Sequence, residues 1–463
     1  MHAAGVLVHT AVIQEGTAPG PAFPRWMVGC LGARRTIGPV GATAARPVTS
    51  AAPTTRFYGW RVVAAAFTVL FVAYGLQFSF GVFVNEITDD TGWSRADILL
   101  PYAVYVALYS WLSSVSGWAT DRYGPRRVVA IGAVILGIGW AGFGLSHALW
   151  QVYLTLGVVA AVGMSATWVP CNATVVRWFV RRRGTAVGVA SAGGATGNLV
   201  VPPLAAGLIA VVGWRSTIPA MAVVGTVAML ACSRFMVRDP EELGLHPDGD
   251  ALPPVATATS LADEDSFTAA EARRTGTFWC MFALFALTWI AVFVPFAHLA
   301  AFAEDLGDSA LAASLLLSAI GLGGVAGRLT IGPLSDRVGR RPTLAFLLAL
   351  QVVAFSGFAA AHGLWMLFPA AVLFGAAYGG STTILPALVG DQFGRRAAGA
   401  IVGQIFAGAG AMAAIGPYVA AAIYDATASY RMAFLLSGAS NLVAMLLVGL
   451  LRPPRRPVDL VPA

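Results

Sequence analysis

One arginine, Arg328, stands well inside an apolar stretch of the chain, in the segment GLGGVAGRLTIGPLSDR. A guanidinium at the centre of a membrane helix costs roughly 2.5–3.5 kcal/mol on insertion scales, so something must offset that cost. No Asp or Glu occurs in the interior of any comparable stretch. An unpaired, permanently cationic fork is what carboxylate binding requires. The alternative is snorkelling, because Leu334 at the predicted helix end is about 9 Å away along a helix.

Other polar side chains also lie in apolar stretches, where such groups are costly and are usually either functional or packed against a partner. Tyr378, in FGAAYGGSTT, is the strongest of them because its small neighbours leave space beside the hydroxyl. Further candidates for substrate contact, with internal packing as the alternative, are Asn198, Gln77, Gln404 and Tyr105. His298 is the candidate for proton coupling because imidazole titrates near neutral pH, although a lone histidine at a helix end is often an interfacial residue.

A polar motif occurs twice, as GWATDRYGPRR (117–127) and as GPLSDRVGRR (332–341). Its glycines would let the preceding helix end approach a neighbour closely. Its aspartates would be acceptors beside arginines and the positive ends of helices. The residues of the repeated pattern are Gly117, Asp121, Arg122, Gly124 and Arg126, then Gly332, Asp336, Arg337, Gly339 and Arg340.

The elements that position these residues are long apolar helices. The 463 residues are 57% apolar, with a mean hydropathy of +0.74, which is typical of a membrane protein. Each membrane crossing needs about 20 apolar residues and must satisfy its own backbone groups, so we predict an all-α membrane protein with twelve transmembrane helices. The predicted crossings lie at about 60–84, 97–117, 128–146, 150–173, 185–211, 216–236, 277–301, 310–333, 343–361, 364–388, 399–423 and 432–451.

Charge sets the predicted orientation. All 29 basic residues are arginine. Arg328 lies inside a predicted crossing, and Arg95, Arg215 and Arg431 lie in loops on one side of the membrane. All other arginines lie in the two tails, or in the loops and helix ends on the opposite side. The positive-inside rule then places both termini in the cytoplasm and the protein in the cytoplasmic (plasma) membrane as a multi-pass protein. The net charge of +7 follows from this bias, so it does not favour a nucleic-acid partner.

The chain is an internal duplication. Residues 178–203 parallel residues 392–417, including two arginines after a phenylalanine and a proline near the end. Two parallel six-helix bundles are typical of transporters, with the substrate site between the repeats. The predicted domains are a disordered cytoplasmic tail (1–57), a first bundle (58–236), a cytoplasmic linker (237–275), a second bundle (276–452) and a cytoplasmic tail (453–463). Within the linker, Ser266 is the expected N-cap of a short helix that ends at Arg274.

The repeated motif between the second and third helix of each bundle resembles the signature loop of the major facilitator superfamily, and with twelve crossings the resemblance covers residues 58 to 452. The segments YGWRVVAAAF, RWFVRRRGTAVGVA, DPEELGLHPDG and EARRTGTFW are similar to bacterial members of its monocarboxylate-porter and oxalate/formate-antiporter branch. The resemblance implies that Arg328 is the partner of a substrate carboxylate. It also implies that the motif loops brace the two bundles when the transporter is closed to the cytoplasm.

The sequence departs from this branch at three positions. Gly324 stands where animal monocarboxylate porters place an Asp one helical turn before the Arg, and Phe78 stands where they carry a Lys. Ala409 aligns with the second cation of the oxalate antiporter. One cation in place of two favours a monoanion over a dicarboxylate, and the absent Asp and Lys remove the usual proton relay.

We therefore predict a secondary active transporter that moves a small monocarboxylate or similar organic anion by alternating access. The alternatives are an exchanger of oxalate/formate-type anions and an exporter of another small molecule. The sequence lacks HExxH, GxSxG and Walker-type motifs, and its four cysteines lack metal-like spacing, so we expect no enzyme activity, cofactor or metal. The expected partners are the anion, a co-transported proton and the lipid bilayer, with the protein a monomer.

Overall fold

The computed structural model describes residues 57–249, 266–413 and 415–454. The predicted tail over residues 1–56, the middle of the linker and residues 455–463 lie outside these described residues. All regular elements in the described ranges are helices, and twelve of them, counting the interrupted ones as single crossings, are long and apolar enough to span a membrane. The predicted helix count is confirmed for this part of the chain.

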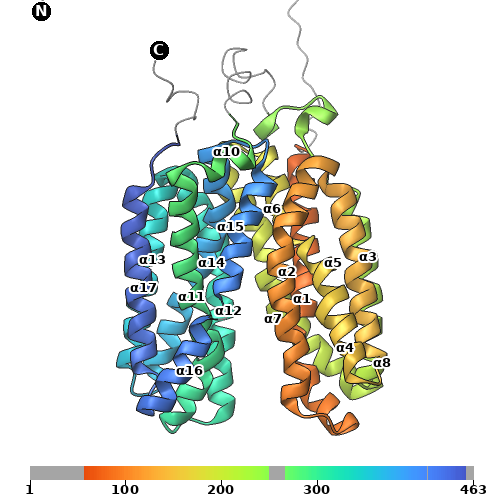
Figure 1. Ribbon diagram of the computed structural model, residues 1–463, viewed down its shortest axis with the longest axis vertical. Helices are drawn as coiled ribbons and strands as arrows, with labels where there is room; N and C mark the ends of the chain where they lie inside the picture. Colours follow the sequence, from red (N-terminus) through yellow and green to blue (C-terminus); the bar gives the residue numbers. More distant parts are fainter. Residues whose placement is uncertain (1–56, 250–265, 414, 455–463) are drawn as a thin grey trace, which may run out of the picture. The chain divides into compact units, whose positions relative to one another are not determined.

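The first bundle comes from the N-terminal half of the chain (Figure 1). It contains α1 (Gly59–Thr91), α2 (Arg95–Tyr123), α3 (Pro125–Gly144), α7 (Arg183–Val212) and α8 (Trp214–Ser233). Its fourth crossing is divided into α4 (Leu149–Val152), the π-helix η1 (Tyr153–Ala160), α5 (Ala161–Ser165) and α6 (Trp168–Trp178).

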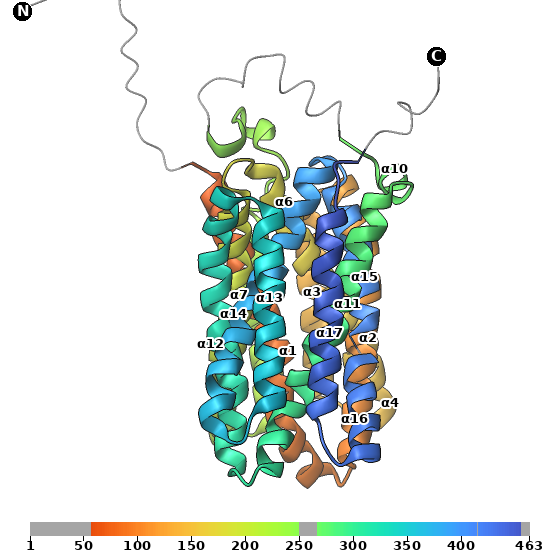
Figure 2. The ribbon, with the colours of Figure 1, turned by 90° about the vertical axis from the view of Figure 1, so that its left-hand side faces the viewer.

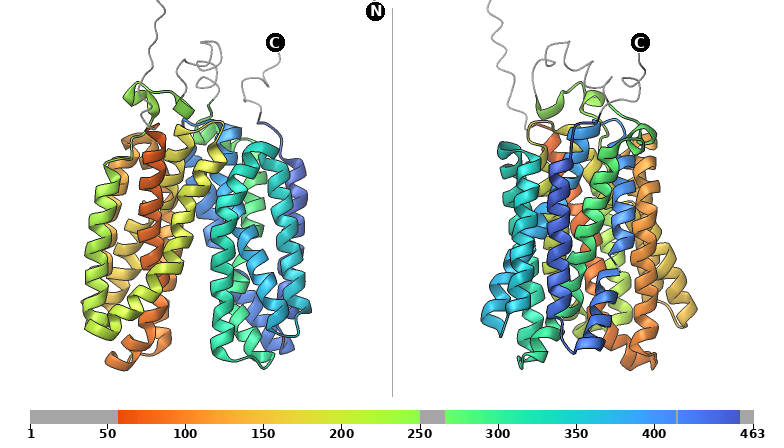
Figure 3. Two further views of the ribbon diagram at one scale, coloured as in Figure 1. Left: turned by 180° about the vertical axis from the view of Figure 1, so that it is seen from behind. Right: turned by 60° about the vertical axis from the view of Figure 1, so that its left-hand side comes forward.

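The second bundle repeats this order beside the first, and both are seen from behind in Figure 3. It contains α11 (Gly276–Asp305), α12 (Ala310–Val338), α13 (Arg340–Ala360), α14 (Leu364–Phe393), α15 (Ala398–Met412), α16 (Ile415–Thr427) and α17 (Arg431–Leu450). The start of α1, the end of α17 and the short helix α10 lie at one end of the bundles, which we call the inner end (Figure 2).

Two crossings that the sequence predicts as continuous are interrupted, and a proline explains each interruption. A proline ring clashes with the carbonyl four residues earlier and removes one helical hydrogen bond. Pro170 follows Ala166, where the fourth crossing leaves helical geometry. Pro417 follows Ala413, the residue after α15 ends. In both bundles the interruption therefore lies four residues before a proline.

Glycine pairs spaced four apart bring neighbouring helices into backbone contact. A Cβ built on Gly193 or Gly197 of α7 would lie 2.1 or 2.2 Å from a carbonyl oxygen of α1. Gly323 and Gly327 of α12 meet the carbonyls of α14 in the same way, at 2.2 and 2.0 Å. Small residues at this spacing let helices pack closely in lipid, where no hydrophobic force drives them together.

The third and sixth helices of each bundle, α3, α8, α13 and α17, present exposed apolar side chains. Ile131 is 61% exposed, Val224 70%, Val353 57% and Leu446 65%. Such faces suit contact with lipid tails. The buried Gln351 of α13 is satisfied within its own bundle, where its carbonyl oxygen accepts a hydrogen bond from Asn441 at 3.2 Å.

The described parts of the linker form the 3₁₀ turns η2 (Pro240–Leu243) and η3 (Pro247–Gly249) and the helix α10 (Ala269–Arg273). The predicted N-cap of α10 is wrong. Thr268 caps it, because its hydroxyl accepts from the Glu271 amide while the Glu271 carboxylate accepts from the Thr268 amide at 2.8 Å. This reciprocal capping box is the stronger arrangement, and Ser266 lies too far upstream to form it.

Candidate functional site

Arg328 lies on α12 at the side that faces the first bundle, where α12 packs against α7. Its guanidinium carbon lies 5.6 Å from the centroid of the Tyr378 ring on α14. Nη1 donates a hydrogen bond to the Gly324 carbonyl at 3.1 Å, one turn back on the same helix. No carboxylate among the described residues forms an ion pair with Arg328. Most of its donors are therefore available to a bound anion.

Gly324 leaves room for this guanidinium. A Cβ built on Gly324 would lie 3.0 Å from Nη1 of Arg328, so any side chain at this position would press on the guanidinium. Gly324 stands at the position where animal monocarboxylate porters carry an aspartate, so this chain has no carboxylate one turn before Arg328. The cation is consequently held by a carbonyl and an aromatic face, neither of which neutralises it.

Tyrosines from both bundles surround the arginine. Tyr74 of α1 lies within electrostatic range of Arg328 and Tyr378, and Tyr109 of α2 lies within range of Tyr74 and Tyr378. Tyr378 also stacks on Phe374 and meets the edge of Phe296. The arrangement combines one cation with neutral hydroxyls and apolar walls, which suits a small anion that has an apolar part. We call Arg328, Tyr378, Tyr74 and Tyr109 the central cluster.

The other predicted contact residues come from both bundles. Gln404 of α15 has a buried side-chain oxygen without a hydrogen-bond partner among the described residues, and Asn198 of α7 is half-buried. The side-chain oxygens of Gln77 and Tyr105 are likewise buried without a hydrogen-bond partner in this part of the chain, so all four remain candidates for substrate contact. Gln77 is 4% exposed and its backbone carbonyl accepts from the Tyr102 hydroxyl at 3.3 Å. Tyr105 is completely buried and borders the central cluster, because its ring lies against that of Tyr109.

Tyr105 lies in a row of three tyrosines along α2. Its ring lies between those of Tyr102 and Tyr109, with centroids at 5.6 and 5.4 Å. The three tyrosines share one helix face, as their spacing predicts. Only Tyr109 among them comes within electrostatic range of Tyr378 in the other bundle. Sequence spacing cannot distinguish these three positions by depth.

His298 lies on α11 beside the interruption of the eleventh crossing. Its Nε2 is 3.0 Å from the Pro417 carbonyl, and its ring centroid is 4.9 Å from that of Tyr430. Burial, with the nearby Asp305 carboxylate, raises the pKa of Tyr430, so this hydroxyl stays neutral beside the imidazole. His298 is thus satisfied by the helix that begins after the interruption and is not part of the central cluster.

The aspartate of each motif copy binds the start of a helix in the other bundle. Asp121 of α2 accepts hydrogen bonds from the amides of Gly399 and Ala400 in α15, at 3.2 and 2.7 Å. Asp336 of α12 accepts from the amides of Gly184 and Thr185 in α7, at 2.8 and 2.7 Å. These amides are the second and third of each helix, which have no partner within the helix. A carboxylate there also meets the positive end of the helix.

Arginines complete each arrangement differently. Around Asp121, the buried Arg177 of α6 binds Asp121 at 2.9 Å and Asp239 of the linker at 3.0 Å. It also donates to the Arg396 carbonyl of the second bundle at 2.6 Å. We call these residues with Gly399 and Ala400 the first inner contact.

Around Asp336, Arg340 binds Asp336 at 2.6 Å and Asp391 of α14 at 3.1 Å. Arg183 of the first bundle forms a further ion pair with Asp391. We call these residues with Gly184 and Thr185 the second inner contact. The glycine of each motif copy permits both contacts, because a Cβ on Gly117 or Gly332 would lie 2.1 or 2.4 Å from a carbonyl of the other bundle.

An aromatic contact between the bundles was not predicted. Trp168, the first residue of α6, stacks on Phe406 of α15 with centroids 4.6 Å apart, and Phe406 meets the edge of Trp289 at 5.1 Å. Phe406 lies eight residues into α15, roughly 12 Å from its start. The only signal in the sequence is Pro170, whose clash with Ala166 starts a new helix at Trp168.

Comparisons with known proteins agree with this arrangement. The sequence profile of the Major Facilitator Superfamily matches residues 65–309 and 290–463. Human monocarboxylate transporter 11 is 28% identical over 405 residues, which cover 82% of this chain and 80% of that protein. Rat monocarboxylate transporter 4 is 25% identical over 407 residues, covering 84% and 82%.

Solved transporters share the fold at low sequence identity. A proton:xylose symporter superposes with a TM-score of 0.67 at 14% identity, covering 86% of this chain and 97% of that one. The fucose:proton symporter of E. coli gives 0.63 at 14% identity, covering 86% and 100%. With the two parallel bundles, the twelve crossings and the family match, the chain belongs to the Major Facilitator Superfamily and is a multi-pass membrane transporter of the monocarboxylate-porter type rather than an enzyme.

Proposed function

We propose that this secondary transporter moves a small monocarboxylate by alternating access and that Arg328 binds the carboxylate. One observation carries the proposal. Arg328 lies within a membrane helix without a carboxylate partner in the described part of the chain, and both bundles contribute tyrosines beside it. Binding an anion would offset the cost of holding this cation in the membrane. A planar guanidinium also matches the two oxygens of a carboxylate.

The surroundings of Arg328 favour a monoanion. A dicarboxylate would bring a second negative charge into a site lined by Tyr74, Tyr378 and apolar side chains, where Ala409 supplies no second cation. Burying an unpaired charge in such a site is expensive. The same reasoning disfavours oxalate exchange, although formate carries a single charge and fits. An exporter of neutral lipophilic compounds would leave Arg328 unpaired.

The inner contacts support a rocking mechanism. In the arrangement described here, both motif aspartates and the Trp168–Phe406 stack join the bundles on the inner side. Opening this side requires the aspartates to leave the helix starts and the two rings to separate. Such bistable contacts between repeats are how transporters of this architecture alternate access. We assign this state to a transporter closed to the cytoplasm. We also propose that both termini are cytoplasmic and that the protein is a monomer in the plasma membrane.

For proton coupling we propose His298. Of the histidines in the described part of the chain, it alone lies within a membrane-spanning helix. Its contact with Pro417 would link its protonation to the position of α16. Substitution of His298 by Gln, which keeps one N–H donor, should abolish the dependence of uptake on a pH gradient while leaving exchange at equal pH intact.

The test of the anion site is uptake of labelled lactate, pyruvate, acetate, formate and oxalate by purified protein in liposomes. We expect saturable uptake of a monocarboxylate that falls at least about 30-fold in Arg328→Gln, since removing one partner of a buried charge pair costs about 2–5 kcal/mol. Arg328→Lys should recover part of it, because the charge remains while the fork is lost. The matched control is Arg215→Gln, which removes an arginine whose partner, Asp90, is half exposed.

The outcomes separate the candidate functions. Uptake of oxalate that resists a monocarboxylate competitor would favour the exchanger. If Arg328→Gln takes up the anion as fast as the wild-type protein does, Arg328 is not the anion site. The protein would then be a transporter of another small molecule.

A further inference from the structure

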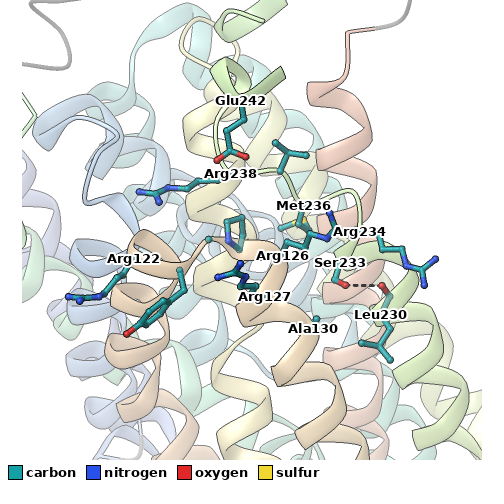
Figure 4. Close-up of a pocket in the computed structure, with 14 residues that line it drawn as sticks. Arg122, Arg126, Arg127, Ala130, Leu230, Ser233, Arg234, Met236, Arg238 and Glu242 are labelled. Carbon is teal, nitrogen blue, oxygen red and sulfur yellow. Dashed lines mark hydrogen bonds between the residues drawn. The ribbon is translucent and has the colours of Figure 1, made fainter. Parts of the chain in front are cut away.

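A basic cleft opens at the inner end of the first bundle, away from the central cluster. Its volume is about 800 Å³, and it lies between the start of α3 and the residues that follow α8 (Figure 4). The charged residues that line it are Arg122, Arg126, Arg127, Arg234, Arg238 and Glu242. The anion site does not use this cleft, and the cleft meets the first inner contact through the Arg238–Asp239 ion pair.

Its positive charge is largely uncompensated by the protein. In the described ranges, no carboxylate forms an ion pair with Arg126, Arg127 or Arg234, and Arg238 pairs only with its neighbour Asp239 at 3.3 Å. Arg122 lies instead over the rings of Trp118 and Tyr123, at 5.6 and 5.7 Å. Five guanidinium groups around one cleft repel one another unless an anion joins them.

The backbone adds donors on the same side. Helix α3 begins with Pro125 after Gly124, whose φ of 86° no other residue adopts easily, and no side chain caps this helix start. The amides of Arg126 and Arg127 in its first turn therefore lack a partner within the helix. Free amides, the helix dipole and arginine forks together form a site for phosphate.

The position of the cleft indicates where the phosphate comes from. Directly outward of it, α3 and α8 present lipid-facing side chains, with Ile131 61% exposed, Val134 40% and Val227 62%. A headgroup in the cleft would leave its acyl chains along these side chains. We propose that the cleft binds the phosphate of an anionic phospholipid from the adjoining leaflet. Basic pockets at membrane-facing helix ends recognise such lipids.

The experiment measures binding of dioctanoyl phosphatidylglycerol to the full-length protein in detergent. Dioctanoylglycerol, which has the same acyl chains but no phosphate, tests for the lipid tail alone, and sn-glycerol 3-phosphate tests for a free phosphate ester. The variant is Arg127→Gln with Arg234→Gln. The matched control is Arg274→Gln with Arg341→Gln, which removes two arginines from the same side of the membrane outside the cleft. At about fivefold per arginine, we expect binding of phosphatidylglycerol to weaken about 30-fold in the variant only.

Each outcome decides a separate point. Binding of phosphatidylglycerol but not of glycerol 3-phosphate supports the lipid headgroup. Equal binding of both supports a phosphate site that takes a free ester and overturns the lipid source. Equal affinity in the variant and the control, or equal binding of dioctanoylglycerol, overturns the phosphate site. If the double variant aggregates, the single substitutions Arg127→Gln and Arg234→Gln give the same comparison.

Discussion

The two inner contacts use the same backbone geometry but opposite charges at one equivalent position. In both, a motif aspartate accepts from the second and third amides of a helix in the other bundle. In the duplicated alignment, however, Arg177 of the first bundle corresponds to Asp391 of the second. The first contact is therefore completed by Arg177 and the linker, and the second by Arg340 and by the Arg183–Asp391 pair between the bundles.

This difference shows which part of the contact the duplication had to keep. An aspartate at a helix start needs only free amides and a close backbone, and the motif glycines provide the approach in both copies. The cation that balances the aspartate can come from any nearby element. The first copy has Pro125 where the second has Arg340, so Arg177 supplies the charge instead. The ion pairs diverged while the helix-start contact was retained.

The largest expected effect comes from removing Arg177. Its loss leaves Asp121 and Asp239 without their shared cation in a buried place, and breaking a buried pair costs about 3–5 kcal/mol. Arg340→Gln should cost less than half as much, because Asp391 keeps Arg183 and Asp336 keeps its two amides. Thermal unfolding of the detergent-solubilised protein measures both, with the half-exposed Arg215→Gln as the control. Equal losses from the two substitutions would contradict the asymmetry.

Asp121→Asn and Asp336→Asn should each shift the equilibrium between closed and open protein toward the open state. The two shifts should be similar, and smaller than the effect of removing Arg177. Losing a helix-start acceptor costs about 1–2 kcal/mol, which is about five- to thirtyfold in the ratio of closed to open protein. The probe is a cysteine at Ser113, which is buried where α2 packs on α15, in a background without natural cysteines. Maleimide labelling from the inner side should accelerate in both variants.

The control for these aspartates is Asp97→Asn, which removes a carboxylate that caps the outer start of α2 itself. If Asp121→Asn leaves labelling at the rate of this control, the first contact does not hold the inner side closed. If only one of the two aspartates matters, the retained geometry does not have the same role in both copies.

The smallest effect should come from the linker. Asp239→Asn removes one partner of Arg177 but leaves Asp121, and the Asp239 side chain is 26% exposed. We expect a loss of about 0.5–1 kcal/mol. The same labelling assay should show no change at the second contact, probed with a cysteine at Ser335, which is buried beside Gly184. A faster rate there would mean that the linker couples the two contacts.

The sequence predicted the twelve crossings and the duplication because lipid imposes one strong rule, an apolar helix with all its backbone groups paired. It missed the interruptions at Ala166 and Ala413, since prolines also occur within the continuous α7 at Pro202 and Pro203. Whether a proline breaks a membrane helix depends on neighbours that can satisfy the freed carbonyl, and the sequence of one helix does not contain them.

For the candidate site, the sequence singled out Arg328 because a charge in an apolar helix is conspicuous, and Tyr378 because of its small neighbours; the two side chains lie against each other in the structure. It gave Tyr105 as a candidate, whereas Tyr109, one helical turn further along the same face, is the tyrosine of α2 that approaches Tyr378. It missed Arg177, which looks like one of several arginines at an inner helix end yet is 5% exposed between two carboxylates. Such pairings join residues from α2, α6 and the linker, and only the tertiary packing shows them.

The linker contacts have a consequence for the order of synthesis. Asp239 lies after α8, so both carboxylate partners of Arg177 have been made before the second bundle begins. Asp248 also accepts from the amides of Val180 and Arg181 at this stage, at 3.1 and 2.9 Å. The first bundle can therefore mature on the ribosome with its buried arginine already neutralised. Arg183 pairs with Asp391 of the second bundle, so this ion pair forms only after α14 has been made.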